Sequence, residues 1–331
     1  MNLTKQTILL TGGTGSFGKA FIAHLLSQKT FKGVIRIYSR DEFKQHALMA
    51  KYQGDKRLRF LLGDVRDLRR LKRAIVGVDY VIHAAALKQV PLLEYNPFEA
   101  IHTNIMGSEN VIEASLDENV SKVILISSDK AVSPVNLYGA TKMVAEKIFI
   151  QANSYGGEKS TKFSVVRYGN VMGSRGSVVP VFISQAKNNH ITITDIRMTR
   201  FWITLEQGVE LVINTLGKMK GGEIFVPKIP SVRITEVAKA ISPNSKIRIV
   251  GIRPGEKLHE ALISFDESRH TREFKNYFLI EPEFDWWAGS SKVKKKPVDG
   301  FMYSSDNNNK WLSAEKIKTL ISDIASDGAG Y

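Results

Sequence analysis

Short apolar runs alternate along the first half of the chain with longer segments whose apolar residues recur at helical spacing. Runs of about four to eight apolar or β-branched residues predict strands, and longer amphipathic segments predict helices. The predicted strands are Thr7–Thr11, Val34–Tyr38, Leu58–Leu62, Tyr80–Ala84, Lys122–Ser127 and Phe163–Arg167, and the predicted helices are Phe17–Gln28, Asp41–Tyr52, Leu68–Val76, Pro97–Asn119 and Leu137–Tyr155. This alternation predicts an α/β fold with a doubly wound parallel sheet.

A glycine-rich turn follows the first predicted strand. The chain reads TGGTGSFG from Thr11 and then enters a predicted helix. Glycines at such a junction let the backbone approach a pyrophosphate closely, and free N–H groups at the helix start attract its charge. We therefore expect a Rossmann-like dinucleotide site with contacts from Gly12, Thr14, Gly15, Ser16, Phe17 and Gly18.

The segment after the second predicted strand favours NADP as the cofactor. An NAD enzyme places an acidic residue near this point for the ribose hydroxyls, whereas the chain reads SRDEFK here. The residues suited to a ribose 2′-phosphate are Ser39, Arg40 and Lys44. The alternative is that Asp41 and Glu42 cap the next helix and the enzyme uses NAD.

Further cofactor contacts are expected at the ends of later strands. Asp64 follows the third strand, where it is placed to accept a hydrogen bond from the adenine amino group, or alternatively to cap the following helix. The neighbouring contacts are expected from Val65, Ala84 and Val171.

Two motifs after the fifth predicted strand carry candidate chemistry. The chain reads SSDK from Ser127 and YGATK from Tyr138. Tyr138 and Lys142 are four residues apart on a predicted helix, so their side chains share one face. In this arrangement Lys142 is expected to lower the pKa of the phenol and bind the cofactor ribose, while Tyr138 takes a hydroxyl proton as hydride leaves the same carbon.

Composition narrows the classes of protein and partner. The 331 residues are 43% hydrophobic and include no cysteine, which excludes disulfides and cysteine-bound metals. No apolar run is long enough to span a bilayer and no signal peptide precedes the glycine motif, so we expect a cytoplasmic protein without a membrane anchor. The net charge of +14 suits phosphorylated metabolites, and we expect no nucleic-acid site, because the dense basic run Lys292–Lys296 reads as a surface loop.

The chain is expected to divide into three parts. Residues 1–168 form the cofactor-binding part, which later strands also join. Glycines and Pro180 break the alternation after Tyr168, and residues 169–265 are mainly a substrate-binding portion. Residues 266–331 form a C-terminal extension of unknown role.

Together these motifs resemble the extended short-chain dehydrogenase/reductase family over residues 6–265. The matching segments, beside the glycine turn and YGATK, are AAALK from Ala84, TNIMG from Thr103, RYGNV from Arg167, RMTRFW from Arg197 and IRPGEK from Ile252. Retaining 4,6-dehydratases of the family carry Asp-Glu where this chain has Asp129-Lys130, and C-4 epimerases generally lack such a pair. A lysine there resembles the inverting UDP-N-acetylglucosamine 4,6-dehydratases, the first enzymes of pseudaminic acid synthesis.

The resemblance implies a sequence of proton transfers. Tyr138 deprotonates the C-4 hydroxyl as hydride passes to NADP. Lys130, as a neutral amine, removes the C-5 proton, and Asp129, in its protonated form, donates to the departing C-6 hydroxyl. Either Lys130 or Tyr138 returns a proton to C-5. The alternative without a catalytic role is that Asp129 and Lys130 form a surface ion pair after a strand.

Substrate contacts are also carried over from the resemblance. Those expected to hold the sugar and the phosphates of UDP-N-acetylglucosamine are Lys88, Ser128, Asn170, Arg200, Arg253 and Glu256. The resemblance further implies a homo-oligomer, with a hexamer as one form, and no metal ion. The predicted helices Pro97–Asn119 and Leu137–Tyr155 are its expected contact surfaces.

Two alternatives stay open. One is a related C-5 epimerase or dehydratase of capsule or O-antigen synthesis, which shares the Asp-Lys pair; the segment around Trp202 is more similar to the pseudaminic branch. The other is a non-catalytic NADP sensor, which usually lacks part of the tyrosine, lysine and acid set that is complete in this chain.

Overall fold

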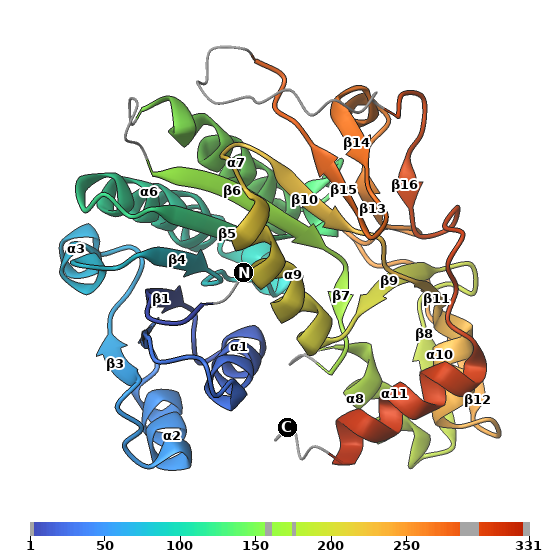
Figure 1. The fold of residues 1–331 in the computed structure, drawn as a ribbon. Helices are drawn as coiled ribbons and strands as arrows, with labels where there is room; N and C mark the ends of the chain where they lie inside the picture. Colours follow the sequence, from blue (N-terminus) through green and yellow to red (C-terminus); the bar gives the residue numbers. More distant parts are fainter. Residues whose placement is uncertain (1–2, 156–160, 174–176, 285–297, 327–331) are drawn as a thin grey trace.

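A nine-stranded sheet forms the centre of the molecule in the computed structural model, which describes residues 3–155, 161–173, 177–284 and 298–326 (Figure 1). Its order is β14-β15-β10-β6-β5-β4-β1-β2-β3. The strands are β1 (Thr7–Thr11), β2 (Val34–Ser39), β3 (Leu58–Leu62), β4 (Tyr80–His83), β5 (Lys122–Ser128), β6 (Lys162–Tyr168), β10 (Ile224–Pro227), β14 (Thr271–Glu273) and β15 (Tyr277–Ile280). β15 is antiparallel to both of its neighbours, and the pairs from β10 to β3 are parallel. The predicted doubly wound parallel sheet is confirmed.

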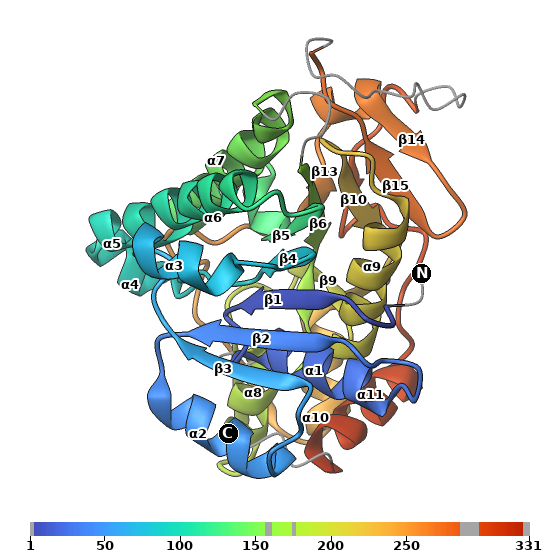
Figure 2. The ribbon, with the colours of Figure 1, turned by 60° about the vertical axis from the view of Figure 1, so that its left-hand side comes forward.

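Helices cover both faces of this sheet (Figures 1 and 2). α1 packs against α9 on one face, whereas α6 packs against α3 and α7 on the other. The helices around the sheet are α1 (Ser16–Ser27), α2 (Glu42–Tyr52), α3 (Leu68–Ile75), α4 (Val90–Tyr95), α5 (Pro97–Ile101), α6 (Gly107–Asp117), α7 (Leu137–Gln151) and α9 (Leu205–Lys218). The central strands are buried on both faces, and their side chains form the larger hydrophobic core.

One predicted helix is wrong in detail. Pro97–Asn119 is not one continuous α-helix, because the π-helical segment η1 (His102–Met106) separates α5 from α6. Within η1, the buried Asn104 accepts a hydrogen bond from the backbone N–H of Leu87 at 2.8 Å and donates to its carbonyl oxygen at 2.9 Å. A π-turn in a helix often marks a functional site, and here it fixes the loop that carries Lys88.

A second, smaller core lies beside the carboxyl ends of the parallel strands, at the lower right of Figure 1. It is built from residues of α8 (Val178–Ala186), α10 (Ile234–Ile241), α11 (Ala314–Ser326) and β8 (His190–Ile193). The exposed strand β12 (Lys246–Ile249) pairs with β8 in parallel. A small sheet of β7 (Asn170–Val171), β9 (Thr199–Ile203) and β11 (Ser231–Arg233) connects the smaller core to the main sheet, and β13 (Ala261–Ile263) pairs with β16 (Tyr303–Ser304).

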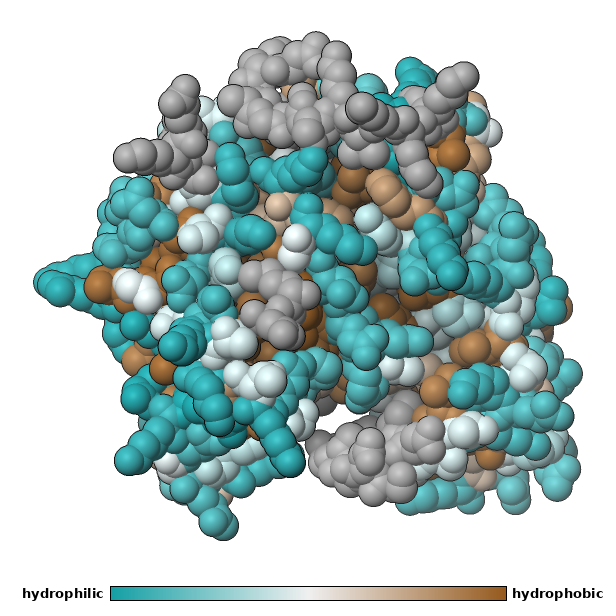
Figure 3. All heavy atoms as spheres, in the orientation of Figure 1, coloured by the Kyte–Doolittle hydropathy of each residue, from teal (hydrophilic) through white to brown (hydrophobic). Residues whose placement is uncertain are grey.

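The chain beyond residue 266 is integrated into both cores. β14 and β15 extend the main sheet, and α11 packs on α10. The basic run Lys292–Lys296 lies outside the described residues. The face in view in Figure 3 is mostly hydrophilic, with apolar side chains scattered over it.

Candidate active site

A cleft of about 920 Å³ opens at the carboxyl ends of the neighbouring strands β1 and β4. Ligands of doubly wound sheets bind at this switch point, because the connections leave the two strands in opposite directions there. The predicted residues that line the cleft are Gly12, Thr14, Gly15, Ser16, Phe17, Gly18, Ser39, Arg40, Lys44, Asp64, Val65, Ala84, Lys88, Ser128, Lys130, Tyr138, Lys142, Asn170, Val171, Arg200, Arg253 and Glu256. Asp129 is the exception: it lies behind Lys130, fully buried.

The glycine turn at one end of the cleft leaves no room for side chains. Gly12 has a φ of +67°, and a Cβ there would lie 2.8 Å from the backbone nitrogen of Ala85. A Cβ on Gly18 would lie 2.4 Å from the carbonyl oxygen of Gly13. Gly15 begins α1 without a side chain to cap the helix N–H groups. This turn fits the pyrophosphate of a dinucleotide cofactor, whose oxygens take the place of a capping side chain.

The segment after β2 supports both of the sequence interpretations in part. Asp41 does cap α2, because its carboxylate accepts the backbone N–H of Lys44 at 2.9 Å and also pairs with the Lys44 ammonium. Arg40 nevertheless lines the cleft, with Nη1 3.5 Å from Asp64 Oδ2. The helix-cap alternative for Asp64 is wrong, since Asp67 caps α3.

Tyr138 and Lys142 lie at the start of α7, which Asn136 caps by accepting the N–H of Gly139 at 2.8 Å. Both side chains are buried, and Lys142 Nζ donates to the carbonyl oxygen of Ile126 at 2.6 Å. Burial lowers the pKa of Lys142 to about 8, although Glu146 acts in the opposite direction. Burial raises the pKa of Tyr138, so the predicted lowering of the phenol pKa by Lys142 is wrong; the nearby cation that opposes the upward shift is Lys130.

Asp129 and Lys130 occupy a 3-10 turn, η2 (Asp129–Ala131), immediately after β5. Ser128 Oγ donates to Asp129 Oδ1 at 2.7 Å, and Lys130 Nζ lies 3.1 Å from the same oxygen. Although burial lowers the pKa of Lys130, its neighbours Asp129 and Glu260 raise it more strongly, so the net shift is upward. Lys130 therefore rests as an ammonium. The surface ion-pair alternative is wrong because Asp129 is fully buried.

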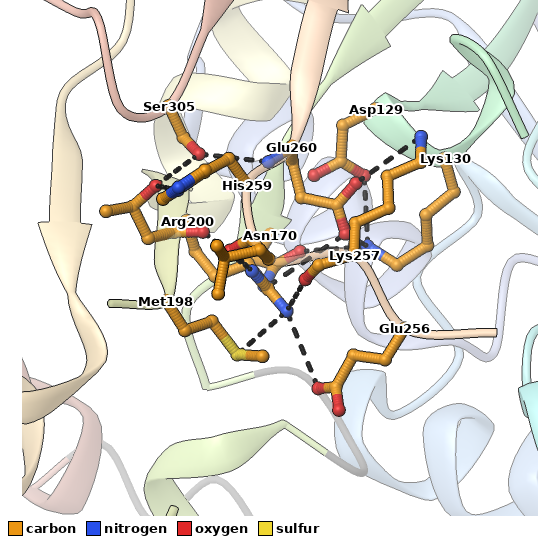
Figure 4. A network of polar contacts seen from close by, with 12 residues as sticks. Asp129, Lys130, Asn170, Met198, Arg200, Glu256, Lys257, His259, Glu260 and Ser305 are labelled. Carbon is orange, nitrogen blue, oxygen red and sulfur yellow. Dashed lines mark hydrogen bonds and ion pairs between the residues drawn. The ribbon is translucent and has the colours of Figure 1, made fainter. Parts of the chain in front are cut away.

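A network of charges continues from Lys130 toward the second core (Figure 4). Glu260, only 3% exposed, places Oε1 3.3 Å from Lys130 Nζ, and Asn170 Oδ1 lies 3.4 Å from the same nitrogen. Glu260 is not among the residues predicted from the sequence, although it follows the IRPGEK segment by only three residues. A single glutamate at this position does not indicate a site in the sequence, because its partner Lys130 lies 130 positions earlier in the chain.

Three further cations line the cleft: Arg200, Lys88 and Arg253. Arg200 lies 3.5 Å from Glu256 and donates to backbone carbonyl oxygens of Thr199, Leu258 and Lys257. Lys88 lies close enough to Lys130 that burial and repulsion between the two cations both lower its pKa. The Arg253 side chain is exposed at the rim.

The described residues contain no group of His, Asp or Glu able to hold a metal ion, and none of their helices is long and apolar enough to cross a membrane. His83 is buried between Thr11 and Ser108, at 2.7 and 3.1 Å. Burial lowers its pKa to about 3, so the ring is neutral and serves the packing beneath the glycine turn.

Comparisons with known proteins agree with this architecture. Residues 8–282 match the family model described as polysaccharide biosynthesis protein. A curated inverting UDP-N-acetylglucosamine 4,6-dehydratase from Campylobacter jejuni is 51% identical, covering 96% of this chain and 97% of that protein. A UDP-glucose 4-epimerase from Rickettsia bellii is 42% identical over 96% of each chain.

Among solved structures, Pen from Bacillus thuringiensis superimposes with a TM-score of 0.88 at 39% identity, covering 98% of this chain and 100% of that one. The match to the family model spans most of the chain, and these relatives cover nearly all of it. The chain therefore belongs to the polysaccharide biosynthesis protein family and has the fold of the extended short-chain dehydrogenases/reductases.

Proposed function

We propose that this protein is an NADP-dependent lyase that dehydrates UDP-N-acetylglucosamine and inverts C-5, yielding UDP-2-acetamido-2,6-dideoxy-β-L-arabino-hexos-4-ulose. The observation that carries the proposal is the pair of the buried Asp129 and the cleft-lining Lys130 beside Tyr138. An elimination that starts next to a ketone needs a base and an acid at adjacent carbons, and this pair supplies both. The 51% identical relative carries the name of this activity.

The residues act in an order that their positions support. The phenol of Tyr138 first gives up its proton to solvent; the phenolate then takes the proton of the C-4 hydroxyl, and the resulting ketone acidifies C-5. Lys130 rests as an ammonium, so it must first lose a proton; transfer to Asp129 Oδ1, 3.1 Å away, produces the amine and the carboxylic acid together. The amine then removes the C-5 proton, and Asp129 protonates the departing C-6 hydroxyl. Lys130 or Tyr138 then donates a proton to C-5.

The glycine turn and the basic residues after β2 hold the cofactor in this proposal. Gly12–Gly18 would hold its phosphates, Ser39, Arg40 and Lys44 its 2′-phosphate, and Lys142 its ribose. NADP held there would supply the hydride chemistry at C-4 and C-6. Asp64 and Val65 would bind the adenine end, and Ala84 and Val171 line the cleft toward Tyr138.

The diphosphate of the substrate binds to Lys88, Arg200 and Arg253, because all three cations line the cleft. Glu256, paired with Arg200, accepts hydrogen bonds from the hydroxyls of the uridine ribose. Ser128 and Asn170 face the sugar from two strand ends. Residues 169–265 thus supply most of the substrate contacts.

The enzyme acts in the cytoplasm as a homo-oligomer, either a dimer or a hexamer, and catalyses the first step of pseudaminic acid synthesis for flagellin glycosylation. Exposed apolar side chains on α5, η1 and α7 support self-association: Phe98, Met106 and Met143 are 71%, 44% and 37% exposed. Apolar groups gathered on adjacent helices commonly mark an interface.

The test is to incubate the purified protein with UDP-N-acetylglucosamine in deuterated water, without added cofactor, and to follow the products by NMR. The L-arabino 4-keto-6-deoxy sugar with deuterium at C-5 is the expected product. A D-xylo product would show that C-5 is not inverted, and a C-4 epimer would place the chain with its Rickettsia relative. Absence of any reaction would favour another UDP-sugar or a sensor without activity.

A further inference from the structure

Glu260 is held rigidly at the wall of the cleft. It directly precedes β13, and its backbone N–H donates to Ser305 Oγ at 3.0 Å while its carbonyl oxygen accepts the N–H of Ser305 at 2.8 Å. The side chain is 3% exposed. Because the backbone N–H and C=O of Glu260 are both anchored and its side chain is buried, few rotamers are open to the carboxylate.

The contacts of Lys130 Nζ match the hydrogen-bonding capacity of an ammonium. Its acceptors are Asp129 Oδ1 at 3.1 Å, Glu260 Oε1 at 3.3 Å and Asn170 Oδ1 at 3.4 Å (Figure 4). After one proton has moved to Asp129, the amine keeps two N–H groups. Glu260 accepts one of those two in both protonation states, so the nitrogen keeps this contact while rotation about the Cε–Nζ bond turns its lone pair toward the sugar.

Two further cations flank the Glu260 carboxylate. Lys257 Nζ lies 3.9 Å from Oε2, and Arg200 Nε lies 4.0 Å from Oε1. Oε2 is buried and makes no hydrogen bond. A buried carboxylate that leaves one oxygen unpaired costs stability, which a role in the reaction explains better than one in folding.

We propose that Glu260 is a positioning residue for Lys130, which holds the amine nitrogen toward C-5 of the sugar while that carbon loses its proton. This inference rests on the proposed function. The proton leaves C-5 for Nζ, the electron pair of that bond moves into the enolate of the C-4 ketone, and the C-6 hydroxyl leaves as water with the proton of Asp129. Glu260 keeps its charge and gains no proton in any step.

The test compares Glu260→Ala and Glu260→Gln in the full-length enzyme. Two partial reactions are measured with UDP-N-acetylglucosamine: reduction of the bound cofactor on mixing, which reports C-4 oxidation, and loss of the C-5 proton, followed with C-5-deuterated substrate. In Glu260→Ala we expect C-4 oxidation to stay near the wild-type rate, C-5 proton loss to fall by roughly 10- to 100-fold, and the isotope effect to increase. Glu260→Gln keeps an acceptor oxygen and should recover part of that loss.

The direction of the change in the rate of C-5 proton loss distinguishes a positioning role of Glu260 from an effect of its charge. Removing the carboxylate makes the Lys130 ammonium easier to deprotonate, so lost charge alone would not slow a base. Equal rates of C-5 proton loss in Glu260→Ala and wild type would overturn the proposal, and so would an equal slowing of both partial reactions. Glu223→Ala is the matched control: Glu223 is buried but off the cleft, where it bonds Ser164 and turn N–H groups, so stability should fall while both rates hold.

A second measurement does not depend on the activity. NMR titration of isotopically labelled lysine, with the Lys130 signal assigned from Lys130→Arg, should show a lower Lys130 pKa in Glu260→Gln than in wild type. An unchanged Lys130 pKa in Glu260→Gln would show that Glu260 does not contact the Lys130 ammonium. If wild type does not convert the substrate, the proposed function fails, and this titration still decides whether Glu260 acts on Lys130.

Discussion

Arg167 and Glu146 form a bidentate ion pair in the core: Nε lies 3.0 Å from Oε1, and Nη2 lies 2.6 Å from Oε2. Their side chains are 2% and 3% exposed. Glu267, from the 3-10 turn η4 (Asp266–His270), adds contacts at 3.0 and 2.8 Å to the same guanidinium. The C-terminal residues are thereby tied to β6 and α7, the elements that flank the active site.

Breaking this pair should strongly destabilise the protein. Arg167→Met leaves the Glu146 carboxylate buried without its cation, and we expect the free energy of unfolding to fall by about 3–5 kcal/mol. Denaturant unfolding followed by circular dichroism measures the change. Arg197→Met is the control, because Arg197 is 67% exposed in its pair with Asp195 and should change stability by less than about 0.5 kcal/mol. Similar losses in the two variants would contradict the assigned role of burial.

The same cluster predicts a pH dependence. Burial raises the pKa of Glu267, but the charge and hydrogen bonds of Arg167 lower it further, so the net shift is below the ordinary value of 4.5. A carboxyl whose pKa is lower in the folded protein stabilises it above that ordinary value and loses the effect as pH falls through the folded value. The stability difference between wild type and Glu267→Gln should therefore be constant near neutral pH and shrink below about pH 4.5. A difference that persists in acid would show that the effect is not ionic.

Much of the fold could be predicted from the sequence because its signals are local. Each of the first six strands was located to within one residue at either end, since short apolar runs flanked by turns leave little choice. The π-segment at His102–Met106 could not be predicted, because it depends on hydrogen bonds between Asn104 and a distant loop. Its residues have ordinary helical composition.

The candidate site likewise combines residues in local motifs, which could be predicted, with residues brought together only by the fold. The glycine turn and YGATK are contiguous motifs, and their residues do meet at one cleft. Glu260 reaches Lys130 only because β13 lies beside η2, a contact between segments far apart in sequence. The resting charge of Lys130 was likewise missed, since it depends on this second carboxylate.

Two helical glycines offer a matched test of the cofactor turn. In Gly18→Ala the new Cβ would lie 2.4 Å from the Gly13 carbonyl oxygen, so α1 must move and the pyrophosphate cradle with it. We expect the purified variant to have lost most of its bound cofactor, measured by absorbance and mass spectrometry after denaturation. Gly208→Ala in α9 meets nothing nearer than 4.0 Å and should keep the cofactor and gain slightly in stability. Equal cofactor content in both would exclude a phosphate cradle at Gly18.

Tyr138→Phe tests the first proton transfer. The variant keeps the ring but cannot take the C-4 hydroxyl proton, so we expect kcat to fall by about 10²- to 10⁴-fold. Substrate binding, measured by calorimetry, should change little. Tyr80→Phe, at the opposite end of the parallel strands, should retain full activity. Reduced cofactor forming at the wild-type rate in Tyr138→Phe would assign the base to another residue.

Arg40 tests the choice between the two nicotinamide cofactors. Its side chain is half exposed at the cleft, and Asp64 is its partner at 3.5 Å. A 2′-phosphate would form a shorter, charge-assisted pair with this guanidinium, so Arg40→Ser should weaken NADP binding by roughly 10- to 100-fold and leave NAD binding unchanged. Calorimetry with each cofactor on cofactor-depleted protein measures both affinities, with Arg59→Ser, off the cleft, as the control. If Arg40→Ser weakens the two cofactors equally, the guanidinium contacts a group that both share, and Asp41 at the start of α2 then becomes the candidate ligand for the ribose of NAD.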